Sequence, residues 1–241
     1  MDPCLRRGLR RFDLLNMTTL KLAIWDMDGT IVDSREVIQA AMCRAFGLCG
    51  LPEPDYEDTR KVVGLGLEEA CRILAPDYHD VPGLSTAYKE AFVARRTEAN
   101  FVEPLYDGAE ASLKRLAEDG WLIAMATGKS HRGIRAIFEM HPLEQYFDTI
   151  WCADDGPGKP HPFMVEQCMS TLGCEPSQSL IIGDAVHDIS MGRNAGIHTM
   201  GVSWGFGRKT ELQAAGAHEV HDTFESLNSG LIEFAQKISH S

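Results

Sequence analysis

Five short apolar runs recur along the chain, and each ends in a polar cluster. They are LKLAIWD (20–26), WLIAMATG (121–128), FDTIWCADD (147–155), SLIIGD (179–184) and HTMGVSW (198–204). Their apolar residues are continuous rather than alternating, as expected for parallel strands that helices cover on both faces. The runs therefore predict an α/β fold with a Rossmann-like parallel sheet.

Helical stripes separate the later runs. The apolar members are Ala109, Leu113, Leu116 and Ala117 in one stripe and Ile134, Ile137 and Phe138 in another. Gly120 and Gly196 stand where the helices of this pattern are expected to end. The alternation of strand and helix supports a parallel sheet.

Residues 33–104 interrupt this alternation. The segments REVIQAAMCRAFG, LEEACRILA and STAYKEAFVARRTEA are helical in pattern, and no convincing strand lies among them. We therefore predict a helical cap domain at 33–104, inserted into an α/β core that comprises 20–32 and 105–241. An insertion after the first strand lies over the crevice where open sheets bind ligands, so it is placed to act as a lid.

Composition excludes some classes of function. The hydrophobic content of 44% and the charged content of 24% are ordinary for globular proteins, and no apolar run approaches the ~18 residues of a membrane span. The net charge of −12 disfavours nucleic acid as a partner. We expect a protein without membrane or nucleic-acid partners, either a monomer or a small homo-oligomer.

Residues 1–19 contain four arginines ahead of the first apolar run. A secretory signal needs a longer apolar stretch and a cleavage site of small residues, and neither is present. We expect a disordered extension, or sequence upstream of a second possible start at Met17.

Seven cysteines form no CxxC pair, and their odd number cannot pair completely. They are typical of reduced, mostly buried thiols in a cytoplasmic protein. Their spacing to histidines does not indicate a zinc site.

Carboxylates follow two of the runs. Asp26 and Asp28 are two apart on an extended strand end, so both side chains can face the crevice. Asp184 follows a later run, and Asp188 lies one helical turn further on. Such a cluster is costly unless a cation neutralises it, and hard oxygen ligands suit Mg²⁺.

An alternative explanation is purely structural, because aspartates at strand ends often cap helices and DGT alone can be a turn. Three other residues favour a catalytic site over this structural explanation. They are Thr127 and Gly128 at the end of the second run, and Lys159 in GKPHP.

The chain resembles the haloacid dehalogenase superfamily over residues 20 to about 225. The resemblance rests on four motifs: DMDGT with Asp26 and Asp28, the pair Thr127 and Gly128, GKPHP with Lys159, and GDAVHD with Asp184 and Asp188. The segment 105–121 also resembles the point where members with a small helical cap re-enter the core. The resemblance implies a phosphatase in which Asp26 is the nucleophile, Asp28 is the general acid and base, and Thr127, Gly128 and Lys159 bind the phosphoryl group. It further implies that Mg²⁺ is held by Asp26, by the main-chain carbonyl of Asp28 and by Asp184, with Asp188 further from the ion.

Two positions depart from the family pattern. Ala185 stands where many relatives have Ser or Thr, and TGK replaces the commoner TN or SN, so Gly128 offers no side-chain amide. Lys129 could reach substrate, but we interpret it as an exposed lysine at a helix start.

The stretch VGLGLEEA resembles the cap of phosphoglycolate phosphatase-like enzymes. Arg60 and Lys61, just before it, are candidates to meet an anionic substrate, although a solvated charged face is the alternative. The expected substrate is a small phosphomonoester of the phosphoglycolate or sugar phosphate type.

Two other functions stay open. A phosphomutase would share all four motifs, but mutases commonly have Arg three residues after a cap glycine, where this chain has Leu67. A phospho-accepting regulatory domain would place its acceptor after a later strand, would be about half as long and would lack a second Asp like Asp28.

Overall fold

The fold is taken from a computed structural model that describes residues 20–99 and 101–239. The predicted disordered extension at 1–19 lies outside the described residues. Within the described ranges, no helix combines the length and the apolar character that crossing a bilayer requires.

A six-stranded parallel sheet forms the centre of the α/β core. Its strands are β1 Leu22–Trp25, β2 Leu122–Thr127, β3 Thr149–Cys152, β4 Ser179–Gly183, β5 His198–Val202 and β6 Glu219–His221. The order across the sheet is β3-β2-β1-β4-β5-β6, and every neighbouring pair is parallel. The five predicted strands are confirmed. The sequence pattern missed β6, a three-residue edge strand.

The chain leaves β1 for β2 on one side of the sheet and later reaches β4 on the other side. The carboxyl end of β1 is therefore the point where the direction of strand order reverses. Ligands of open α/β sheets bind at such a point.

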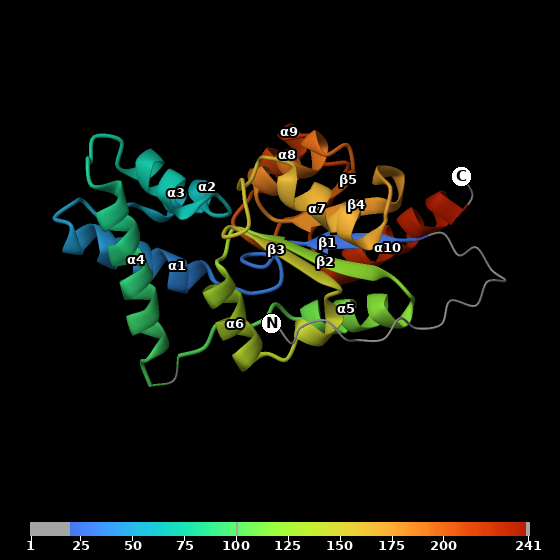
Figure 1. The fold of residues 1–241 in the computed structure, drawn as a ribbon, viewed down its shortest axis with the longest axis horizontal. Coiled ribbons are helices and arrows are strands. Elements are labelled where there is room, and N and C mark those ends of the chain that lie inside the picture. Colours follow the sequence, from blue (N-terminus) through green and yellow to red (C-terminus); the bar gives the residue numbers. More distant parts are fainter. Residues whose placement is uncertain (1–19, 100, 240–241) are drawn as a thin grey trace, which may run out of the picture.

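Helices cover both faces of the sheet (Figure 1). They are α5 Ala109–Glu118, α6 His131–Met140, α7 Phe163–Leu172, α8 Val186–Asn194, α9 Lys209–Ala214 and α10 Phe224–Ser239, with short 3-10 turns at Glu144–Tyr146 and Pro176–Gln178. Apolar residues of α5, α6 and α10 pack on the face that carries Ala23 and Trp25. Those of α7 and α8 pack on the face that carries Leu22 and Ile24. Alternate residues of β1 thus supply two cores, which explains why the run is continuously apolar.

Four helices follow β1 before the sheet resumes, and Figure 1 shows them together at one end of the molecule, beyond the sheet. They are α1 Arg35–Leu48, α2 Tyr56–Val62, α3 Leu67–Leu74 and α4 Val81–Arg96. These helices, here called the helical insertion, have a core of their own, which includes Met42, Phe46, Cys71 and Leu84.

The chain enters and leaves the helical insertion at one place. The amide of Asp33 donates to the carbonyl of Pro104 at 2.8 Å, and Val32 forms an antiparallel bridge with Leu105. This pairing supports our proposal that residues 33–104 form a cap domain.

One predicted helical stripe needs correction. In α5 the buried residues are Ala109, Ser112, Leu113 and Leu116, whereas Ala117 is exposed. Ser112 is tolerated inside because its hydroxyl donates to Asn228 of α10 at 2.6 Å. Gly120 and Gly196 follow α5 and α8 with positive φ, as expected of residues that end helices.

The six described cysteines are all free, and four of them are buried. Those four are Cys71, Cys152, Cys168 and Cys174. Within the described residues, the prediction of mostly buried thiols is confirmed, and their reduced state stays a prediction.

We expect Leu113→Ala to lower the free energy of unfolding by about 2 to 5 kcal/mol, because Leu113 is fully buried between α5 and the sheet. Chemical denaturation measures the effect. Lys114→Ala, an exposed change on the same helix, is the control and should shift stability by less than about 0.5 kcal/mol. A loss at Leu113 no larger than the control's would contradict this packing.

Candidate active site

The end of β1 presents two carboxylates to the crevice. Asp26 continues the strand pairing, since its amide donates to the carbonyl of Ile182 at 2.9 Å. Met27 turns into the core beneath the sheet, while Asp26 and Asp28 line a cavity on the other side. The alternation expected for an extended strand end is therefore present.

Three carboxylates converge beside this strand end. Asp26, Asp184 and Asp188 are all buried, and one oxygen of each lies within 4.8 Å of the others. Asp184 follows β4 and Asp188 lies in the first turn of α8, so neighbouring strands bring them together.

Lys159 joins two of these carboxylates. Its Nζ lies 2.6 Å from Asp26 Oδ1 and 2.6 Å from Asp188 Oδ1. The side chain is 0% exposed, so the ammonium depends on these two partners. Burial opposes its charge, but the attraction of Asp188 and Asp26 is stronger and raises the pKa of Lys159.

The remaining negative charge is not balanced by the protein. Burial raises the pKa of Asp26 from 3.8 to about 7, although Lys159 pulls it down. Burial and the charges of Asp188 and Asp26 raise the pKa of Asp184 well above its usual range. Three carboxylates and one ammonium thus leave a site that favours an additional cation.

Asp184 is held in one orientation by two donors that the sequence pattern did not single out. The Thr30 hydroxyl donates to its Oδ1 at 3.0 Å, and the amide of Phe206 donates to its Oδ2 at 2.7 Å. Gly29 has φ +82°, and a Cβ there would lie 2.2 Å from Asp184 Oδ2. The DGT segment therefore needs glycine for close approach to this carboxylate.

Asp188 also shapes the start of α8. Its Oδ2 accepts a hydrogen bond from the amide of Ala185 at 3.0 Å. Ala185 has no side-chain oxygen to cap this helix, so the carboxylate three residues on satisfies the free amide instead. Of the acidic residues predicted to bind metal, Asp26, Asp184 and Asp188 come together, and their oxygen donors fit a hard divalent cation.

The side chain of Asp28 turns away from this cluster toward Lys129. Lys129 Nζ lies 2.9 Å from Asp28 Oδ1 and 3.9 Å from Glu103 Oε1, above the ring of Phe92. Its side chain is 8% exposed, so our interpretation of an exposed lysine is wrong. The reason is that α6 is capped by Ser130, which leaves Lys129 on the loop beneath α4.

Glu103 is a second residue that the sequence pattern did not indicate. It is fully buried, and its Oε2 accepts from Arg96 at 2.7 and 3.0 Å. It lies on the segment that returns from the helical insertion to the core. A buried Glu outside any motif gives no sequence signal, because its partners Arg96 and Lys129 come from different elements.

Thr127 and Gly128 lie where β2 ends. Both line the same cavity of about 470 Å³, which the core and the helical insertion enclose together. A Cβ at Gly128 would lie 2.7 Å from the carbonyl oxygen of Gly64 in the insertion. This approach gives a physical reason for glycine where TN or SN is commoner.

The structure does not bring Arg60 and Lys61 to the cavity. Arg60 is 6% exposed and forms a two-point ion pair with Glu211 of α9, at 2.8 Å for each contact, as well as a pair with Glu57. Lys61 is exposed and pairs with Asp58. Arg60 therefore links the helical insertion to the core, and Lys61 lies on a solvated face; a contact of either with substrate is not supported.

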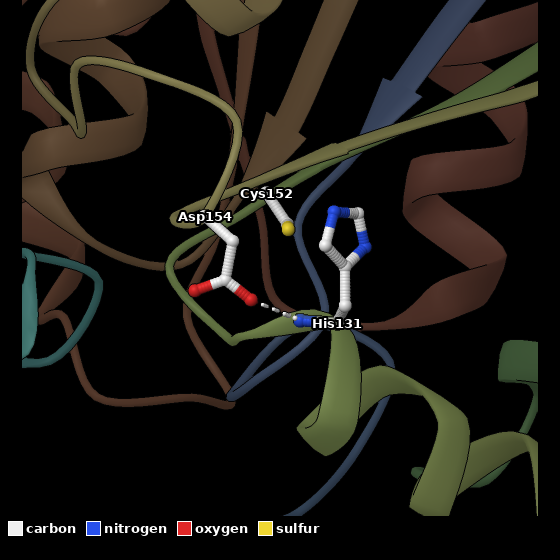
Figure 2. Close-up of side chains that lie close together, drawn as sticks. All are labelled: His131, Cys152 and Asp154. Carbon is white, nitrogen blue, oxygen red and sulfur yellow. Dashed lines mark hydrogen bonds between the residues drawn. The ribbon is translucent and has the colours of Figure 1, made fainter.

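A separate cluster of possible metal ligands lies at the start of α6. Figure 2 shows His131, Cys152 and Asp154, with the Asp154 carboxylate accepting from the His131 amide at 2.8 Å. The His131 ring pairs with Asp155 at 2.9 Å, and burial raises the pKa of the Cys152 thiol to about 12. A neutral thiol among groups that already have partners indicates a structural network that holds this turn to α6.

Comparison with known proteins gives one family. Residues 23–202 match the model of the family described as haloacid dehalogenase-like hydrolase. Among curated relatives, a probable phosphatase, IndB, from Dickeya dadantii is 32% identical over 86% of this chain and 91% of that protein. The pyrophosphatase PpaX from Bacillus mycoides is 26% identical over 86% of this chain and 95% of its own length.

A solved structure of a predicted phosphatase from Clostridium acetobutylicum has the same fold. Its TM-score is 0.79 at 24% identity, with 89% of this chain and 99% of that chain covered. The predicted fold, an α/β core with inserted helices, is thereby confirmed.

We expect Asp26 to lower the stability of the metal-free protein as pH rises from about 4 to about 7. The folded state keeps the proton of Asp26 up to a pKa of about 7, whereas the unfolded chain releases it near 3.8. The loss from this residue should be about 1 to 4 kcal/mol. Asp26→Asn should weaken this pH dependence and be more stable than the wild type at pH 8, as measured by thermal unfolding with a chelator. Asp77→Asn, on the surface, should keep the wild-type profile; an unchanged profile in Asp26→Asn would argue against the buried, uncompensated charge.

We expect the effects of Arg60→Met and Glu211→Gln on stability to be non-additive, because each change removes the same ion pair. A double-mutant cycle should give a coupling free energy of about 1 to 3 kcal/mol. Lys61→Met, which removes only an exposed pair, is the control and should change stability by less than about 1 kcal/mol. Strict additivity of the two changes would mean that the pair does not join the insertion to the core.

Proposed function

The chain belongs to the haloacid dehalogenase-like hydrolases and is a phosphatase of that family, and we propose that it hydrolyses a small phosphomonoester through an aspartyl phosphate on Asp26, with Mg²⁺ as cofactor. The observation that carries this proposal is the position of Asp26. It is held by Lys159 on one oxygen, it lines the cavity, and a second carboxyl group, Asp28, lies two residues away.

In the first step, Asp26 attacks phosphorus. Lys159 contacts Oδ1 at 2.6 Å, and one oxygen of the Asp26 carboxylate forms the new bond to phosphorus. The bond between phosphorus and the oxygen of the leaving alcohol breaks, and Asp28 donates its proton to that oxygen. The products of this step are the free alcohol and the phosphorylated Asp26.

In the second step, water hydrolyses the acyl phosphate. Asp28, now ionised, takes a proton from the water as the water oxygen attacks phosphorus. The bond between phosphorus and the Asp26 carboxylate oxygen breaks, inorganic phosphate leaves, and both carboxyl groups return to their starting states. One acid therefore serves in both steps.

Charge on the phosphoryl oxygens needs fixed donors. The hydroxyl of Thr127 and the amide of Gly128 line the cavity beside Asp26, and the Lys159 ammonium lies against it. When bound, Mg²⁺ would neutralise phosphoryl charge, and Asp26, Asp184 and the Asp28 carbonyl would hold it, with Asp188 positioned by Lys159.

The helical insertion would act as the cap in this mechanism. Its residues line the cavity that Asp26 also lines, and closure over bound substrate would exclude bulk water and strengthen the electrostatic contacts inside. The free cysteines support a further proposal that the protein works in the cytoplasm.

We expect phosphate release from p-nitrophenyl phosphate that depends on Mg²⁺ and stops with a chelator. Asp26→Asn should abolish turnover, and Thr127→Val should lower kcat by about 10² to 10³. Asp222→Asn, far from the cavity, should retain wild-type activity.

Three outcomes would change the assignment. Full activity of folded Asp26→Asn would exclude the aspartyl phosphate. Formation of an isomerised sugar phosphate with little free phosphate would indicate a mutase, and absence of turnover under all conditions would favour a phospho-accepting regulator.

A further inference from the structure

The cavity above Asp26 has an apolar inner wall on the side of the helical insertion. Ile38 and Met42 of α1, together with Val62 and Leu65, line it, and each is less than 10% exposed. By contrast, the charged residues Glu68, Glu69 and Lys89 of the insertion line it at exposed positions. The wall is thus apolar inside and charged at the rim.

One face of α4 completes this wall. Ser85, Tyr88 and Phe92 line the cavity at helical spacing, and Val93 lies beside them. Burial raises the pKa of Tyr88, so its hydroxyl is neutral at any ordinary pH. Ser85 is 3% exposed, and among the described residues its Oγ has no hydrogen-bond partner. A buried hydroxyl without a partner at a cavity wall indicates a place for a polar atom of a ligand.

The buried cations around the cavity already have partners. Arg96 is held by Glu103, and Lys129 is held by Asp28 with Glu103 nearby. The other two cations of the lining, Lys89 and Arg132, are exposed at the rim. A second anionic group on the substrate would have to lose its hydration against Ile38 and Met42, and it would have to compete with Glu103 for Arg96 and Lys129, which is unfavourable.

We infer that the alcohol part of the substrate is uncharged and largely apolar or aromatic, with one polar atom that meets the hydroxyls of Ser85 and Tyr88. This inference rests on the proposed function and names its substrate class. A cavity of about 470 Å³ accommodates a phosphate and one ring. The apolar wall disfavours phosphoglycolate and pyrophosphate, which carry a second anion, and sugar phosphates, whose several hydroxyls would find two partners on this wall.

The test compares phosphomonoesters of aliphatic alcohols, so that leaving groups are chemically similar. We expect kcat/KM for 2-phenylethyl phosphate to exceed that for phosphoglycolate and glucose 6-phosphate by about tenfold to a hundredfold, the worth of burying one ring. Pyrophosphate belongs in the same panel, since one relative is named a pyrophosphatase. Equal or higher kcat/KM for any of the three polar substrates would overturn the inference.

Val93→Thr keeps the shape of the wall and adds a hydroxyl, so it should reduce the preference for 2-phenylethyl phosphate by about threefold or more. Val220→Thr, on the far edge of the sheet, is the matched control and should leave the preference unchanged. An unchanged preference in Val93→Thr would count against the apolar wall as its cause.

Ser85→Ala removes a hydroxyl without a partner, so the fold should keep or gain stability. For 2-(4-hydroxyphenyl)ethyl phosphate we expect KM to rise by about threefold to tenfold, with KM for 2-phenylethyl phosphate unchanged. Equal effects on both esters would exclude a bond from Ser85 to the ligand.

The panel separates this inference from the proposed function. If polar substrates are preferred and turnover still requires Asp26, only the substrate class is wrong. If no ester of the panel is hydrolysed, or if Asp26→Asn retains activity, the proposed function fails and the inference falls with it.

Discussion

The site depends on a single buried ammonium. Lys159 contacts both Asp26 and Asp188, so it allows two carboxylates to lie together at the carboxyl end of the sheet. One ammonium does not neutralise three carboxylates. Burial and the neighbouring carboxylates therefore raise the pKa of Asp26 and of Asp184. A protein that needs a divalent cation for phosphoryl transfer gains from this imbalance, because the folded chain alone leaves the site short of positive charge. The imbalance lowers stability in the absence of a cation, and the carboxylate cluster fits a divalent metal.

Much of this arrangement could be predicted from the sequence. The continuous apolar runs indicate buried parallel strands, and residues at the carboxyl ends of neighbouring strands must meet, which is why Asp26, Thr127 and Asp184 were found. Edge strand β6 escaped prediction because three residues with polar neighbours carry no periodic signal. Thr30 and Phe206 escaped because a hydrogen bond to Asp184 joins segments far apart in the chain.

The residues of the helical insertion were predicted less well, for a related reason. Its helices follow from local patterns, but the direction of each charged side chain depends on what the α/β core places opposite it. Arg60 meets Glu211 and is withdrawn from the cavity, and Lys129 meets Asp28 and is drawn into it. The Arg60–Glu211 pair joins the insertion to the core, and the Lys129–Asp28 pair joins two core segments that lie far apart in the chain. In both cases the sequence around one partner gives no information about the other.

Arg60 also connects the insertion to the carboxylate cluster through a short chain of contacts. Its Nη1 donates to the carbonyl of Phe206 at 3.3 Å, and the amide of the same residue donates to Asp184 at 2.7 Å. The loop at Phe206 therefore connects the helical insertion to the side chain of Asp184 through two hydrogen bonds. A displacement of the insertion that carried Arg60 with it would act first on the residue that orients Asp184, so the position of the insertion and the geometry of the carboxylate cluster are coupled.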